Sequence, residues 1–149
     1  MDDIDFQILK ILQKKARVPN VEIARKVKMA PSAVLERIKK LETSGVIKGY
    51  EVRLNPDMFN CSTIVFVHIK LRELEKLEKI TQSLFEIDQI QELHYLAGED
   101  CLMAKIRVSC NAELENIIRT KIAINDCIKN IKTYIALSTY KESAKISIS

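Results

Sequence analysis

The stretch that decides the fold of the first part of the chain reads Arg17-Val-Pro-Asn20, Val21-Glu-Ile-Ala-Arg-Lys-Val27, Pro31-Ser-Ala-Val-Leu-Glu-Arg-Ile-Lys-Lys-Leu41 and Gly45-Val-Ile-Lys-Gly-Tyr50. In this order it predicts a short helix, a three-residue turn, a basic second helix and a hairpin bounded by glycines. That succession is typical of a winged helix-turn-helix. The sequence therefore predicts a DNA-binding domain near the start of the chain.

Apolar residues in this region recur at helical spacing, which predicts three amphipathic helices around one core. Their stripes are Ile4, Ile8, Ile11 and Leu12 in the first helix, Ile23, Ala24 and Val27 in the second, and Val34, Ile38 and Leu41 in the third. The expected end signals are Asp2 with Asp5 and Asn20 as caps, Pro31 as a first helical residue, Gly45 as a left-handed stop, and Gly49 in a hairpin between residues 46–47 and 50–54.

The third helix turns a polar, basic face away from its apolar stripe. The candidate DNA contacts are Ser32, Ala33, Glu36, Arg37, Lys39, Lys40 and Lys48. Ser32, Ala33 and Glu36 suit base edges, because a hydroxyl, a methyl group and a carboxylate read different groove groups. The lysines suit phosphates. Two roles stay open for Arg37: a phosphate contact, or an ion pair with a carboxylate such as Asp5 or Glu42.

Charge is distributed unevenly over the 149 residues. Residues 1–54 hold 12 basic and 7 acidic residues, whereas residues 55–149 hold 12 and 13. Only the first part is therefore suited to a polyanion. The acidic start and the lack of a long apolar run predict a cytoplasmic protein with no membrane partner.

The four cysteines have no paired spacing that would indicate a zinc site. They are Cys61, Cys101, Cys110 and Cys127, and we expect reduced, mostly buried thiols. His68 and His94 are expected on strands that a third strand separates, so no shared metal site is predicted. No nucleophile and base set or phosphate-binding glycine loop is visible, so the sequence predicts a protein that is not an enzyme and has no cofactor.

Beyond Asn55-Pro56-Asp57 the pattern alternates between strand and helix. The predicted elements are strands 64–71, 90–97, 101–108 and 131–137 and helices 74–87 and 112–124. The order βαββαβ predicts a ferredoxin-like domain, so the fold class is α+β. We divide the chain into a winged helix-turn-helix domain at 1–54, a linker at 55–62 and the ferredoxin-like domain at 63–149.

Both helices of such a fold cover one face of the sheet. Val65, Val67, Ile69 and Leu71 are expected to face these helices. Ile64 and Phe66 then occupy the other face. An apolar sheet face without a cover predicts dimerisation, sheet against sheet.

Over nearly its full length the chain resembles the leucine-responsive regulator and asparagine-regulator (Lrp/AsnC) transcription factors. The matching motifs are Asp2-x-x-Asp5-x-x-Ile8-Leu9-x-x-Leu12-Gln13, Arg17, Pro31-x-x-x-x-x-Arg37-Ile38-x-x-Leu41-Glu42, Gly45-Val-Ile-Lys-Gly-Tyr50, Glu92-x-x-x-x-x-Gly98 and Lys132-Thr-Tyr-Ile-Ala-Leu137. The resemblance implies a regulator that binds double-stranded DNA. It also implies a C-terminal domain that forms dimers, assembles them into octamers and in many members binds an amino acid between dimers.

The implied effector residues are Gly98, Glu99, Asp100, Cys101 and Thr133. The family commonly has Gly-Asp-x-Asp in this turn, so Cys101 stands where a second aspartate is usual. A thiol accepts hydrogen bonds from an ammonium group poorly. Ile131 likewise replaces a frequent threonine, and Ala30 replaces a frequent serine cap.

Two other functions stay open. An octamer could compact DNA as an architectural protein with weak sequence preference. Some proteins that resemble this family are sirohaem decarboxylase subunits. The scattered Arg72, Arg107 and Arg119 and the two histidines fit that enzyme poorly.

Overall fold

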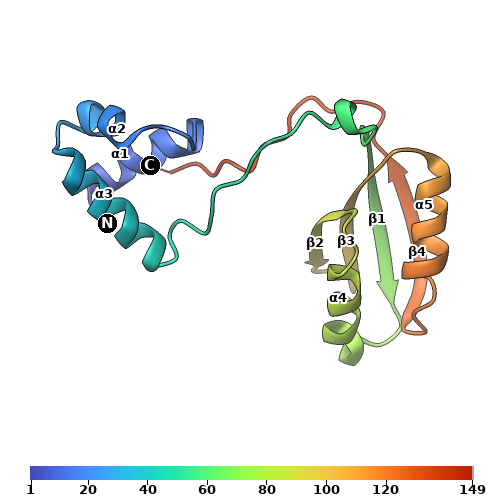
Figure 1. Cartoon of the computed structure of the whole chain (residues 1–149). Helices are drawn as coiled ribbons and strands as arrows, with labels where there is room; N and C mark the ends of the chain where they lie inside the picture. Colours follow the sequence, from blue (N-terminus) through green and yellow to red (C-terminus); the bar gives the residue numbers. More distant parts are fainter. Residues whose placement is uncertain (149) are drawn as a thin grey trace. The chain divides into compact units, whose positions relative to one another are not determined.

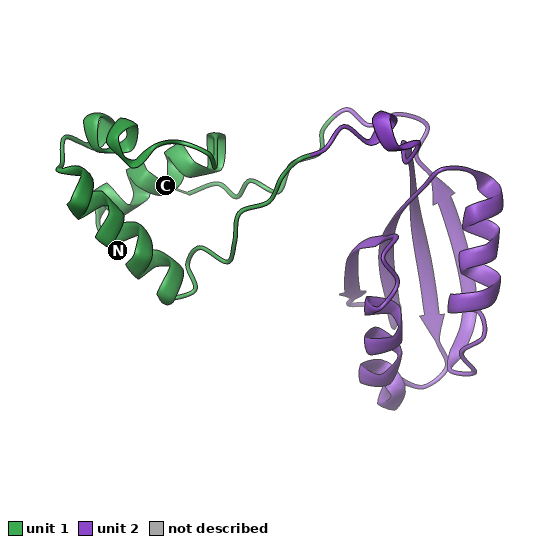
Figure 2. Cartoon of the chain, viewed as in Figure 1, with its two compact units in different colours: residues 1–53, 141–149 green, residues 54–140 purple. Residues whose placement is uncertain are grey.

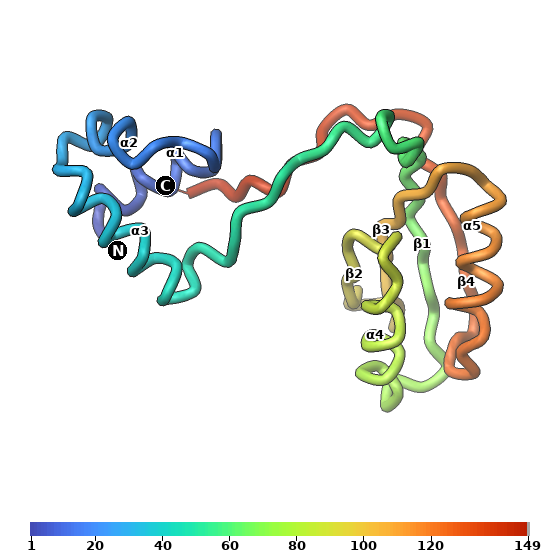
Figure 3. The backbone as a smooth tube through the Cα atoms, viewed as in Figure 1, coloured from blue at the N-terminus to red at the C-terminus, as the bar shows by residue number. Residues whose placement is uncertain are grey.

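The computed structural model describes residues 1–148, which form two compact units (Figure 2). Unit 1 consists of Met1–Arg53 and the tail that starts at Lys141, and unit 2 consists of Leu54–Tyr140. The backbone therefore passes between the units twice, as the tube in Figure 3 shows.

Unit 1 is a bundle of three helices, α1 (Asp3–Lys14), α2 (Asn20–Val27) and α3 (Pro31–Thr43) (Figure 1). Its buried core is made of the residues that the helical spacing selected, namely Ile8, Ile23, Ala24, Val27, Val34 and Ile38. The three predicted amphipathic helices are thus confirmed. Burial of these stripes, more than helix propensity, stabilises elements as short as the eight residues of α2.

The ends of the first two helices are capped differently. At α1 the Asp5 amide donates to the Asp2 carboxylate at 3.0 Å, and the Asp2 amide donates to the Asp5 carboxylate at 3.0 Å, so the predicted cap is confirmed. The predicted Asn20 cap is wrong. Asn20 is already helical, and the carbonyl of Pro19 receives the free amides of Glu22 and Ile23.

The segment after α3 differs from the predicted wing. Gly45 has φ +74°, which confirms the left-handed stop. Residues 46–55, all described, contain no strand, and Gly49 has no positive φ, so the expected hairpin is wrong. The reason is local: the Ile47 amide donates back to the Leu41 carbonyl at 3.0 Å, and the Ile47 side chain packs on the helical core.

Replacing Gly45 by alanine tests this helix end. A side chain at φ +74° is strained, so Gly45→Ala should destabilise the folded chain by about 1 kcal/mol. The matched control is Gly49→Ala, because no heavy atom lies within 4 Å of a Cβ at either position and only Gly45 has a positive φ. Urea unfolding of both variants should show the loss for Gly45→Ala alone. Equal effects would contradict the assigned conformation.

Unit 2 is a four-stranded antiparallel sheet with two helices. Its elements are β1 (Thr63–Leu71), α4 (Leu77–Phe85), β2 (Ile90–Leu96), β3 (Cys101–Val108), α5 (Asn111–Ile117) and β4 (Ile128–Ile135). Single 3₁₀ turns precede β1 and α4. The strand order β2-β3-β1-β4 confirms the ferredoxin-like arrangement.

The boundaries of three elements differ most from the sequence prediction. The helix expected at 74–87 is a 3₁₀ turn followed by α4, and the one expected at 112–124 is α5 followed by a π-helical turn, Ile118–Ile122. The last strand begins three residues early, at Ile128. There Arg72 extends the pairing with β1, since its amide donates to the Cys127 carbonyl at 2.8 Å and its Nε to the Ile128 carbonyl at 3.1 Å.

Helices α4 and α5 lie on the same face of the sheet (Figure 1). Val65, Val67 and Ile69 of β1 are fully buried beneath them. On the other face Phe66 is 39% exposed and has Lys105 and Tyr134 as its cross-strand neighbours. Ile64 also lies on that face, because it alternates with Val65, but it is only 5% exposed, so this part of the predicted patch is not open. What remains of the predicted patch is Phe66, with Leu96 and Tyr134 exposed on the same face.

The tail that starts at Lys141 belongs to unit 1, although the sequence division placed it in the second domain. The side-chain amide of Gln13 on α1 exchanges two hydrogen bonds with the backbone of Ile146, at 3.2 and 2.9 Å. The Gln13 side chain therefore donates one hydrogen bond to the tail backbone and accepts one from it, as the backbone of a neighbouring strand would. A contact between residues 133 positions apart leaves no trace in local hydrophobic spacing.

Candidate functional site

The outer face of α3 presents four exposed side chains in one row. They are Ser32, Leu35, Glu36 and Lys39, at spacing i, i+3, i+4 and i+7. Lys40 is exposed beside this row, and Lys48 is exposed beyond the helix. Sequence reasoning missed Leu35, which is 41% exposed. The sequence did indicate this exposure, because Leu35 falls outside the buried stripe of Val34 and Ile38.

Two other predicted DNA contacts are half-buried. Ala33 lies at the side of the row. Arg37 donates from Nη1 to Asp2 Oδ2 and to Asp5 Oδ1, both at 2.8 Å. The intradomain pair is therefore formed with Asp5, whereas Glu42 instead accepts from the Tyr50 hydroxyl at 2.8 Å. Arg37 thus ties α3 to the start of α1.

These contacts shift ionisation at the helix start. The Asp5 amide and then the Arg37 guanidinium lower the pKa of Asp2 below its ordinary 3.8. The carboxylates of Asp5 and then Asp2 raise the pKa of Arg37. A lowered carboxyl pKa stabilises the folded chain at pH values above 3.8, and this contribution is lost as pH falls through the folded-state value.

We expect Asp2→Asn to flatten the loss of stability on acidification. The melting temperature of the wild-type chain should fall more steeply than that of the variant between about pH 5 and about pH 3. Asp3→Asn is the matched control, since Asp3 also lies in the first turn but forms no cap with Asp5 in the described structure. Parallel curves for the wild-type chain and Asp2→Asn would contradict the assigned cap.

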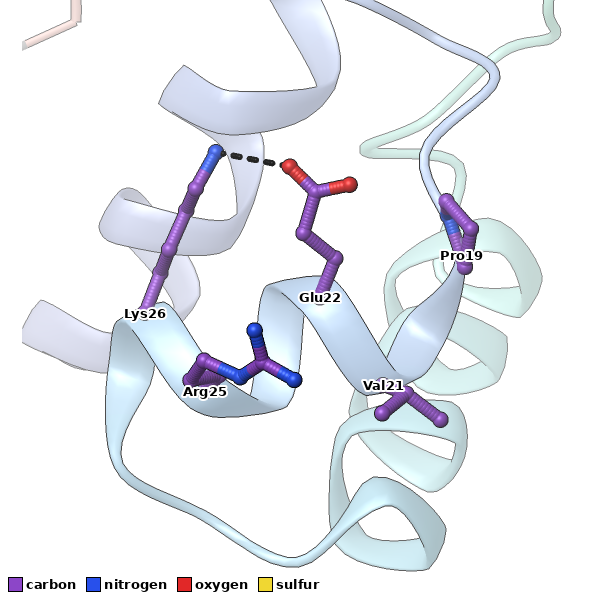
Figure 4. Close-up of a pocket in the computed structure, with 5 residues that line it drawn as sticks. All are labelled: Pro19, Val21, Glu22, Arg25 and Lys26. Carbon is purple, nitrogen blue, oxygen red and sulfur yellow. Dashed lines mark ion pairs between the residues drawn. The ribbon is translucent and has the colours of Figure 1, made fainter.

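Helix α2 adds basic residues that the sequence prediction did not include. An open hollow on this helix is lined by Pro19, Val21, Glu22, Arg25 and Lys26 (Figure 4). Lys26 pairs with Glu22 at 3.2 Å. Arg25 is exposed and forms no ion pair among the described residues. In a helix-turn-helix the helix before the recognition helix crosses the DNA backbone, so Arg25 lies on an element suited to phosphate contact.

The turn between β2 and β3 contains most of the predicted effector residues. Gly98 and Asp100 have positive φ, +98° and +49°. The Tyr95 hydroxyl donates to Asp100 Oδ1 at 3.3 Å. Tyr95 pairs with Leu102 and shares its helix-covered face, whereas Cys101 pairs with Lys70 on the opposite face. The carboxylate of Asp100 and the thiol of Cys101 are thus directed to different sides of the sheet.

Cys101 is fully buried, and this burial raises the pKa of its thiol. Glu99 from the turn meets His68 of β1, with 3.1 Å between Oε2 and Nε2. Thr133 is on β4, opposite Val67 on the helix-covered face. Because β1 separates β4 from β3, one chain does not bring Thr133 together with the turn.

The two histidines do not share a site. His68 and His94 both oppose Met103 on β3, so the predicted separation by a strand is confirmed. Nε2 of His94 instead lies 3.4 Å from Oε2 of Glu92. All four cysteines are free; two are buried, Cys61 is half-buried and Cys110 is exposed. No helix within residues 1–148 is both long and apolar enough to span a bilayer.

Two family models match separate parts of the chain. Residues 1–48 match the family model described as a winged helix-turn-helix DNA-binding domain, and residues 64–146 match the Lrp/AsnC ligand binding domain. The leucine-responsive regulatory protein of Escherichia coli (strain K12) is 31% identical over 99% of this chain and 92% of its own length. The protein of that name from Haemophilus influenzae is 30% identical over 96% and 87%.

Solved structures show the same fold. An AsnC family transcriptional regulator from Agrobacterium tumefaciens superposes with a TM-score of 0.91 at 25% identity, covering 99% of this chain and 97% of that one. A transcriptional regulator from Neisseria meningitidis, solved as a complex with L-Met, has a TM-score of 0.92 at 21% identity and covers 99% and 96%. A helix-turn-helix joined to a ligand-binding sheet domain defines a DNA-binding transcriptional regulator. The chain belongs to the Lrp/AsnC family.

Proposed function

We propose that this protein is a sequence-specific regulator that inserts α3 into the major groove of double-stranded DNA. The observation that carries the proposal is the exposed row on α3, which joins a hydroxyl, an apolar group, a carboxylate and an ammonium group on one helix face. Such a row offers a donor or acceptor, a contact for a thymine methyl and an acceptor for cytosine. In this proposal Ser32, Leu35 and Glu36 contact the base edges, and Ala33 lies beside them.

Phosphate contacts fall to the basic residues around this row. These are Lys39 and Lys40 on α3, Lys48 after it and Arg25 on α2. Arg37 has a positioning role, because its guanidinium is already held by two carboxylates at 2.8 Å. A ring of phosphate contacts would fix the register of α3 and make binding sensitive to salt.

The functional unit in this proposal is a dimer formed through the uncovered face of the sheet, and dimers assemble into an octamer. Phe66, Leu96 and Tyr134 supply exposed apolar surface on that face. A two-fold dimer presents two copies of α3, so the operator should be approximately palindromic. The protein acts in the cytoplasm as a regulator and not as an enzyme.

The effector of the proposed regulator is an amino acid or another small molecule, bound between dimers. The turn offers Glu99, Asp100 and the peptide groups around Gly98, with Thr133 from another chain as a further donor. Only the carboxylates can pair with an ammonium group. Cys101 supplies no such pair, so an effector other than a simple amino acid is the runner-up.

Fluorescence anisotropy of labelled duplexes tests the proposed function. DNA from upstream of the protein's own gene is compared with shuffled DNA at two salt concentrations, with and without a pool of amino acids. Preference for the native fragment supports the regulator, and a shift with the pool supports the effector. Equal, salt-sensitive binding to both duplexes would contradict the sequence-specific regulator and favour an architectural protein. No binding at low salt would exclude DNA as the partner.

A further inference from the structure

A histidine, a glutamate and a cysteine meet on the sheet face that α4 and α5 leave uncovered. His68 on β1, Glu99 in the β2–β3 turn and Cys101 at the start of β3 each offer one ligand atom, and these atoms lie within 4.8 Å of one another. The residues are 31 and 33 positions apart, and pairing of β1 with β3 brings them together. Sequence spacing gave no signal because the cysteine carries no neighbouring metal-ligand motif.

The cluster is built inside a single chain and two of its members are held in place. The side chain of His68 is 12% exposed, Cys101 is fully buried, and Glu99 is 70% exposed. Strand pairing therefore fixes the nitrogen and sulfur donors, while the glutamate is free to adjust. A separation of 3.1 Å between His68 Nε2 and Glu99 Oε2 is close to the ~3.3 Å between two ligand atoms on a tetrahedral zinc ion.

One ring nitrogen of the cluster has no protein partner within the described chain. Nδ1 of His68 is buried and has no hydrogen-bond partner among the described residues. With one ring nitrogen facing Glu99, the neutral imidazole keeps an unpaired polar nitrogen out of contact with water. Such an atom costs free energy unless a partner satisfies it. A cation bound to Nδ1 would supply that partner, whereas a cation bound to Nε2, the nitrogen that faces Glu99, would leave Nδ1 to donate to another acceptor.

We propose that His68, Glu99 and Cys101 bind one divalent transition-metal ion of the zinc class. Imidazole, thiolate and carboxylate together favour such an ion over Mg²⁺ or Ca²⁺, which prefer oxygen ligands alone. On binding, the Cys101 thiol gives up its proton to solvent and the sulfur binds as a thiolate. Three protein ligands leave a fourth tetrahedral position for water or an external ligand. The ion would join the β2–β3 turn to the centre of the sheet.

This site does not depend on the proposed DNA binding, and its test does not use DNA. The reduced full-length chain, freed of metal by a chelator, is titrated with Co²⁺ as a spectroscopic probe and then with Zn²⁺. We expect one Co²⁺ per chain, with a sulfur-to-cobalt charge-transfer band that Zn²⁺ removes. Zn²⁺ should also raise the melting temperature, since it binds the folded state.

Variants identify the ligands. Cys101→Ser should abolish the band, and His68→Gln and the exposed Glu99→Gln should weaken binding by about tenfold or more. Matched controls are His94→Gln, from the exposed pair with Glu92, and Cys110→Ser, which removes an exposed thiol. Both should bind like the wild-type chain. Absence of a sulfur band, survival of the band in Cys101→Ser, or unchanged affinity in both His68→Gln and Glu99→Gln would overturn the proposal.

Discussion

Reversing the charge of Lys39 and Lys40 together should weaken DNA binding by about 100-fold or more at moderate salt. Both side chains are exposed on α3, next to the row that is proposed to meet the bases. Each lost phosphate contact should also lower the dependence of log affinity on log salt by about 1. Anisotropy titrations of Lys39→Glu/Lys40→Glu at several salt concentrations measure both effects.

A double variant in unit 2 provides the control for this charge change. Lys79→Glu/Lys129→Glu alters the net charge equally, and both lysines are exposed side chains of unit 2, outside the helix-turn-helix sequence. It should bind DNA within a few-fold of the wild-type chain. If both double variants lose the same affinity, the basic charge acts as a diffuse attraction and α3 is not the contact surface.

Replacing Phe66 by glutamate should shift the proposed dimer to monomer. Phe66 is 39% exposed at the centre of the uncovered sheet face, and association would bury two unpaired carboxylates there. That penalty corresponds to an affinity loss of about 100-fold or more. Phe66 is already partly exposed in the single chain, so the glutamate can stay in contact with water in the monomer and the fold should persist. Sedimentation velocity across a concentration series measures the change.

The control for this variant is Phe85→Glu. Phe85 is 80% exposed at the end of α4, on the helix-covered side of the sheet. Introducing the same charge there should leave the dimer intact. A wild-type chain that sediments as a monomer, or equal dissociation in both variants, would contradict association through the sheet face.

Much of the fold follows from short-range patterns. The stripes of Ile8, Val34 and Ile38 repeat at helical spacing, and the alternation along β1 selects the residues that α4 and α5 cover. Such patterns report which face of an element is buried. These patterns locate helices and strands well. They locate the ends of an element poorly where a single tertiary contact determines the end, as the contact of Arg72 does at the start of β4.

The errors share a physical cause. Gly49 in a glycine-bounded segment suggested a hairpin, but a backbone bond from Ile47 to Leu41 and burial of Ile47 held the chain against the helices. Asn20 is a good cap by residue type, yet the carbonyl of Pro19 already satisfies the free amides. In both cases a backbone contact visible only in three dimensions outweighed the preference of one residue.

The candidate DNA face could be predicted more fully than the turn. One helix carries the row on α3, so angular spacing alone locates most of it, and only Leu35 was missed. His68, Glu99 and Cys101 come from a strand, a turn and another strand, and their proximity requires the pairing of β1 with β3. The role of Arg37 likewise depended on the position of α1, which spacing within α3 does not reveal.

Selection of binding sites from a random duplex pool is the most direct test of the central claim, which is that α3 reads DNA sequence. The wild-type chain should enrich an approximately palindromic motif. Glu36→Ala should keep the half-site spacing but relax the preference at one position in each half-site, because only one base contact is removed. Two results would contradict base reading by α3. One is that the wild-type chain enriches no motif, and the other is that Glu36→Ala and Ser32→Ala both enrich the same motif as the wild-type chain.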